Sequence, residues 1–69
     1  MILRTYLATK VDEGSPVGDL ARDVARDIKD GGLPERYTVP MLKRRMLDSN
    51  ACDDAFQALW TARGDARRA

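Results

Sequence analysis

The chain has 69 residues, 43% of them hydrophobic and 33% charged, and its 12 basic and 11 acidic side chains leave a net charge of +1. A single cysteine and the absence of histidine exclude an internal disulfide and a conventional zinc site, and the near-neutral charge disfavours a dedicated nucleic-acid binder. A chain this short buries only about 60% of the surface that it exposes when unfolded, so a partner or a second copy is expected to contribute to stability.

The first predicted element is a short amphipathic helix at about residues 2–11. Leu3, Tyr6 and Leu7 recur at helical spacing and form its expected inward face. Charged and polar side chains interrupt the stretch, so we expect neither a secretory signal nor a membrane span. Together with the lone thiol, this favours a cytoplasmic protein.

The second predicted element is a two-faced helix at about residues 16–30. Ser15 is a suitable N-cap, Pro16 suits the first helical position, and a glycine pair ends the helix. Gly18 is expected to allow the close approach of a neighbouring helix. The inward face is apolar and consists of Val17, Leu20, Ala21, Val24, Ala25 and Ile28.

Four aspartates follow the outer face of this helix. They are Asp19, Asp23, Asp27 and Asp30. Carboxylates on a straight helix are spread along a line and do not converge on a cation, and Asp19 with Arg22 and Asp23 with Arg26 are neutralising pairs three residues apart. We therefore expect a solvated flank with no metal or catalytic site, although the same face is one option for protein docking.

The third predicted element is a helix at about residues 39–48. Thr38 can cap its first amides, and Val39, Leu42 and Met46 are expected to point inward. Its outer side carries the only basic cluster of the chain, which consists of Lys43, Arg44 and Arg45.

The fourth predicted element is a helix at about residues 50–63, capped by Ser49 or Asn50 and ending at Gly64. Residues 65–69 are expected to be a frayed basic tail, which leaves a single domain at residues 1–64. The expected apolar stripe consists of Cys52, Ala55, Phe56, Leu59 and Trp60. Cys52 is expected to be buried, and Trp60 is expected to be the centre of the core, with a cost of about 3 to 5 kcal/mol on truncation to alanine.

No stretch alternates with a period of two, so the pattern predicts an all-α, compact four-helix bundle without a sheet. The run PVGDLARDVARD, from Pro16 to Asp27, resembles the segment that typifies the YozE SAM-like family of small bacterial proteins. An aromatic in the first helix, Tyr6, and the pair Phe56 and Trp60 also resemble that family. The resemblance implies a SAM-like helical domain whose biochemical role is not established, and it implies no catalytic residues.

The leading functional hypothesis is a non-catalytic module that binds a protein partner or a second copy. Met41 and Leu47 are apolar residues of the third helix beyond those that its one inward face needs, which favours an exposed apolar contact. The expected docking face consists of Asp19, Arg22, Asp23, Arg26, Met41 and Leu47. We expect no enzyme activity, no cofactor and no small-molecule substrate, because no nucleophile and base are paired in the sequence.

Two alternatives stay open. The chain is an accessory protein that contacts nucleic-acid phosphates, or it is a small phage or plasmid protein that inhibits a host machine. The expected phosphate contacts are Lys43, Arg44, Arg45, Arg67 and Arg68.

Overall fold

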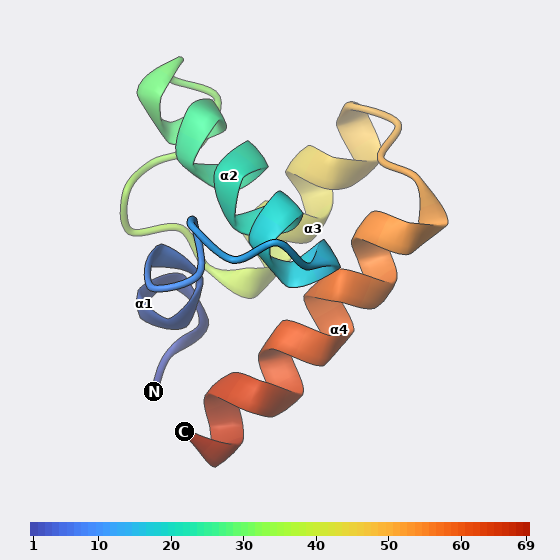
Figure 1. Cartoon of the computed structure of the whole chain (residues 1–69). Helices are drawn as coiled ribbons and strands as arrows, with labels where there is room; N and C mark the ends of the chain where they lie inside the picture. Colours follow the sequence, from blue (N-terminus) through green and yellow to red (C-terminus); the bar gives the residue numbers. More distant parts are fainter.

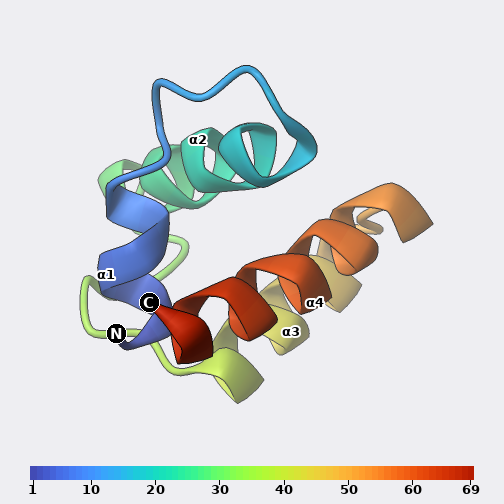
Figure 2. The same cartoon turned by 60° about the horizontal axis from the view of Figure 1, so that its bottom comes forward.

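The computed structural model describes all 69 residues and contains four α-helices and no strand (Figure 1). The helices are α1 (Leu3–Ala8), α2 (Pro16–Lys29), α3 (Val39–Asp48) and α4 (Asp53–Arg68). This confirms the predicted all-α class. α4 packs against both α2 and α1 (Figures 1 and 2), and α3 lies partly behind α4 in Figure 2. The two ends of the chain lie near each other, so the start of α1 is close to the end of α4.

α2 has the boundaries that its sequence predicts. The Ser15 hydroxyl accepts a hydrogen bond from the Gly18 amide at 3.1 Å, and Pro16 occupies the first turn. At the other end Gly31 has a φ of +84°, and the Gly32 amide donates to the carbonyl of Asp27 at 2.7 Å. A left-handed glycine followed by this bond is a Schellman motif, which ends the helix by satisfying its last carbonyls.

α3 begins as predicted and ends with the same kind of motif. The Met41 amide donates to the Thr38 hydroxyl at 3.4 Å. Asn50 has a φ of +56°, and the Ala51 amide donates to the Met46 carbonyl at 2.9 Å. Asparagine tolerates the left-handed region better than most residues. Asn50 and Ser49, which were expected to cap the fourth helix, therefore end α3, and α4 begins only at Asp53.

α4 is longer at its end than predicted. It continues through Gly64 to Arg68, so residues 65–68 are helical and the predicted frayed tail is wrong. Ala66 is buried in the domain, and the Arg68 guanidinium donates to the Asp65 carboxylate at 2.7 Å. This packing outweighs the weak helix propensity of one glycine, which costs about 1 kcal/mol relative to alanine.

α1 is shorter than predicted, because the chain turns after Ala8. The Thr9 hydroxyl donates to the Tyr6 carbonyl at 2.6 Å, which closes the helix. The Arg22 guanidinium then donates to the carbonyls of Val11 and Glu13, each at 2.9 Å. These two hydrogen bonds fasten the connection from α1 to α2.

The core differs from the prediction mainly in α4. Trp60 has 58% of its surface exposed and Cys52 is also exposed, so both predictions of burial are wrong. α4 instead turns its small residues inward, with Leu59 as the one large buried side chain. Trp60 precedes Ala62 by two residues, which places it about 200° around the helix axis, on the outer side. The buried cluster consists of Leu3, Leu7, Val17, Leu20, Ala21, Val24, Leu33, Tyr37, Leu42, Met46, Ala58, Leu59 and Ala62.

The segment between α2 and α3 contributes two core residues that the periodicity of the helices does not predict. Leu33 and Tyr37 are buried in the loop, whereas Ala25 of α2, which was expected inside, is exposed. The Tyr37 hydroxyl has no hydrogen-bond partner, and burial raises the pKa of Tyr37 from 10.0 to about 12, against the opposing field of Arg4. A buried hydroxyl without a partner lowers the stability of the fold.

Replacing Tyr37 with phenylalanine is therefore expected to raise the free energy of unfolding by about 1 kcal/mol at neutral pH. Because the pKa is raised in the folded state, the folded chain keeps a proton that the unfolded chain loses above pH 10, and stability falls as the pH rises towards 12. The difference in free energy of unfolding between the variant and the original chain should therefore be roughly 1.4 kcal/mol larger at about pH 11 than at neutral pH. Urea unfolding of both proteins at several pH values measures this, and an unchanged gap would contradict it.

Candidate docking surface

Trp60 is an exposed indole held between cations from two helices. The Lys43 ammonium of α3 lies 5.7 Å from the centroid of the indole, and the Arg63 guanidinium of α4 lies 4.9 Å from it. Arg63 follows Trp60 by three residues, so the two side chains are neighbours on the helix. Such contacts hold an exposed aromatic ring in one orientation and are worth about 0.5 to 1 kcal/mol each at the surface.

Two further exposed residues lie one helical turn from these cations, one on each helix. Leu47 follows Lys43 by one turn on α3 and has 63% of its surface exposed. Arg67 follows Arg63 by one turn on α4 and is also exposed. We call these five residues, Lys43, Leu47, Trp60, Arg63 and Arg67, the Trp60 surface.

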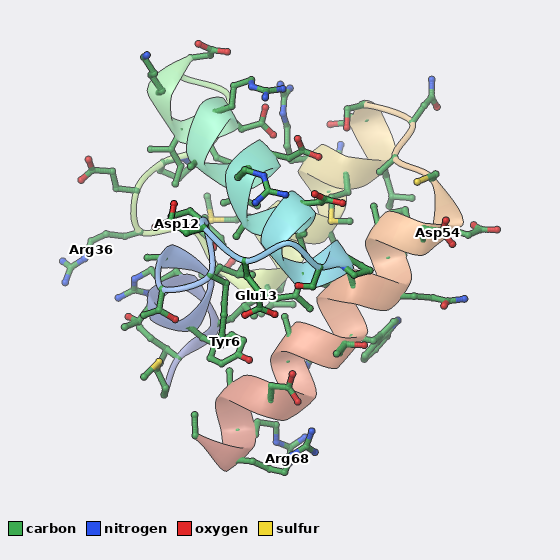
Figure 3. The ribbon with its side chains drawn as sticks, in the orientation of Figure 1. Tyr6, Asp12, Glu13, Arg36, Asp54 and Arg68 are labelled. Carbon is green, nitrogen blue, oxygen red and sulfur yellow. The ribbon has the colours of Figure 1, made fainter.

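The cations of the Trp60 surface form no ion pair with carboxylates of the domain. Six of the twelve basic side chains form ion pairs, but Lys43, Arg63 and Arg67 form none. Asp53 and Asp54 lie at the start of α4, roughly 20 Å from Arg67 at a rise of 1.5 Å per residue. Figure 3 shows Asp54 and Arg68 at opposite ends of this helix. The surface is therefore locally basic although the chain is nearly neutral.

A cavity of about 310 Å³ adjoins the Trp60 surface where α1, α4 and the start of α3 meet. Arg63 and Arg67 line it from α4, and Arg4 lines it from α1. Arg4 forms no ion pair either. Tyr37 and Thr38 also line it, together with the apolar residues Met1, Ile2 and Leu3 at the start of the chain. Three arginines without carboxylate partners thus surround one hollow.

The predicted phosphate-contacting residues do not form one patch. Arg45 lies 3.4 Å from Asp27 of α2, Arg44 lies 3.9 Å from Asp48, and Arg68 pairs with Asp65. Only Lys43 and Arg67 belong to the Trp60 surface. Consecutive residues of a helix are about 100° apart, so Lys43, Arg44 and Arg45 point in three directions.

The predicted docking face is also divided. Asp19 pairs with Arg22, and Asp23 lies 3.9 Å from Arg26, as expected for neutralised flank residues of α2. The connection from α1 occupies Arg22 as well. Met41 lines a separate hollow, beside Pro34 and Arg44, and only Leu47 lies in the Trp60 surface. No acidic or thiol side chains gather as a group of three able to hold a metal ion.

The sequence patterns did not predict the exposure of Trp60, and they placed neither Arg4 nor Arg63 among the candidate residues. One signal was present, because Arg63 and Arg67 follow Trp60 by three and seven residues and must share its face. A tryptophan with two arginines on its own face is half-exposed more readily than one surrounded by apolar residues. No comparable signal exists for Arg4, which only the tertiary fold brings to α4.

Comparisons with protein-family models, with curated proteins and with solved structures found no match to this chain. The resemblance to the YozE SAM-like family therefore stays a prediction. None of the four helices is long and apolar enough to cross a lipid bilayer.

Proposed function

We propose that the chain is a non-catalytic module that binds another protein through the Trp60 surface. The observation that carries this proposal is the exposure of the only tryptophan, which is held by Lys43 and Arg63 without being buried. Tryptophan and arginine are the residue types most enriched at the energetic centres of protein interfaces. Leu47 adds exposed apolar surface on the neighbouring helix.

The proposal is supported by the division of the side chains between the core and the exposed surface. The core is built from aliphatic residues, Tyr37 and the alanines of α4, so Trp60 is not required to complete it. An exposed aromatic ring that does not serve the fold is available for a partner. Inhibition of a larger machine by a small accessory protein would be one instance of such docking, with the same surface as its contact.

Affinity capture from a lysate of the native host tests this proposal. The bait is compared with two variants, Trp60→Ala and Arg26→Ala, both changed at exposed positions. We expect one or more proteins to be recovered by the original chain and by Arg26→Ala and to be lost with Trp60→Ala, because truncating an interface tryptophan typically costs at least about 2 kcal/mol. Recovery that is equal for all three baits, or no recovery at all, would contradict the proposal.

A further inference from the structure

We infer that the partner of the Trp60 surface is an acidic segment of a different protein, which places carboxylates on Lys43 and in the cavity lined by Arg4, Arg63 and Arg67. This inference rests on the proposed function and specifies its partner. Four of the six basic side chains that form no ion pair lie on or beside this one surface. The remaining two, Lys29 and Arg36, lie elsewhere, and Arg36 points away from the domain in Figure 3.

The first argument is the distribution of charge. Cations that form no ion pair within the domain are complementary to an acidic partner, and complementarity of this kind sets the specificity and the association rate of an interface. Arginine also binds a carboxylate through two parallel hydrogen bonds, so the arginine-lined cavity can receive an acidic side chain in a defined orientation. The cavity, of about 310 Å³, has room for such side chains.

The second argument is the apolar part of the surface. Trp60 on α4 and Leu47 on α3 are both exposed, and Lys43, one helical turn from Leu47, lies over the Trp60 ring. An acidic segment that also carries an apolar side chain can cover both, which buries the indole and the aliphatic side chain together. The expected occupant is therefore both acidic and partly apolar.

A single-stranded nucleic acid fits the surface less well. Bases bind by stacking on open aromatic faces, but Lys43 and Arg63 already lie over the Trp60 ring.

A second copy of the chain is also a poorer occupant. Its most regular acidic face, on α2, is already neutralised by Arg22 and Arg26. In a symmetric dimer formed through the Trp60 surface, the cations of one copy would face the same cations of the other copy. The occupant is thus a separate protein whose carboxylates are free.

The fluorescence of Trp60 tests this inference directly, because it is the only tryptophan of the chain. The probe is a short amphipathic peptide of glutamate and leucine that contains no tryptophan, and the control peptide has lysine in place of glutamate. We expect the glutamate peptide to change the emission of Trp60 saturably, with an affinity that falls as salt is added. The lysine peptide should leave the emission unchanged.

Matched variants then locate the charges. Lys43→Glu combined with Arg67→Glu should weaken peptide binding at least about tenfold, because two attractive contacts become repulsive. Lys29→Glu combined with Arg36→Glu changes the same net charge away from the surface and should have little effect. Equal loss in both double variants, no response to the glutamate peptide, or tighter binding of single-stranded oligothymidine would overturn the inference. The affinity capture described above separates this inference from the proposed function. If capture depends on Trp60 but the peptide experiment fails, the chain binds a protein whose contact segment is not acidic.

Discussion

Truncation of two consecutive residues of α4 is expected to destabilise the domain to very different extents. Leu59→Ala should lower the free energy of unfolding by about 2 to 5 kcal/mol, because Leu59 is fully buried and its removal leaves a cavity. Trp60→Ala should cost only about 1 to 2 kcal/mol, since it removes a largely exposed side chain and two surface cation–π contacts. The first loss is comparable to the whole stability of so small a domain, whereas the second leaves it folded.

Urea unfolding followed by far-ultraviolet circular dichroism measures both variants without relying on tryptophan fluorescence. The comparison is sensitive because the two sites share one helix and one substitution type. If Trp60→Ala destabilised the domain as strongly as Leu59→Ala, Trp60 would be a core residue, and the docking surface would lose its centre.

Replacement by alanine is expected to lower the stability of the domain at Gly18 and to raise it at Gly64. A Cβ at Gly18 would lie 1.8 Å from the carbonyl oxygen of Glu13, which Arg22 holds in place, so Gly18→Ala must push the connection from α1 away from α2. We expect a loss of about 3 kcal/mol, at the upper end of the range for overpacking. At Gly64 the nearest atom would be the Arg68 guanidinium at 3.5 Å, an ordinary contact. Gly64→Ala should therefore stabilise α4 by about 0.5 to 1 kcal/mol.

Thermal or urea unfolding of the two glycine variants measures both the expected loss of stability at Gly18 and the expected gain at Gly64. The original chain is the reference, and each variant differs from it by one methyl group. A neutral Gly18→Ala would show that the connection between α1 and α2 moves freely, which would contradict the tight contact at Glu13.

Local signals predicted the helix boundaries where a single residue decides them. Ser15, Pro16 and Thr38 act within one turn of the backbone, and they start α2 and α3 as their side chains require. The glycine pair after α2 ends that helix for the same local reason. Gly18 was correctly identified as a position of close approach, but the neighbour is the Glu13 carbonyl and not a helix.

The errors occurred where tertiary packing decides. Size and hydrophobicity favoured Trp60 as a core residue, but α4 packs against α2 and α1 through Ala58, Ala62 and Ala66, whose small side chains allow the helices to approach. The same packing carries α4 past Gly64. A scale of residue hydrophobicity gives alanine little weight, so the inward face of α4 was misplaced by a rotation about its axis.

The candidate site could be predicted only in part for the same reason. The cluster of Lys43, Arg44 and Arg45 is visible in the sequence, but the fold directs Arg45 to Asp27 of α2 and leaves Lys43 beside Trp60. Pairing between helices depends on their relative placement, which composition and periodicity do not contain. Exposed ion pairs of this kind contribute little energy, but they determine which cations remain free for a partner.

Site-specific photo-crosslinking tests the central claim most directly. A photoreactive benzoylphenylalanine is introduced in place of the exposed Leu47, so that Trp60 is kept, and in a matched control in place of Arg26 on the exposed side of α2. Both chains are irradiated in a lysate of the native host. The proposed docking surface predicts a covalent adduct of defined mass from position 47 and none of that mass from position 26. Equal adducts from both positions, or none from position 47, would contradict it.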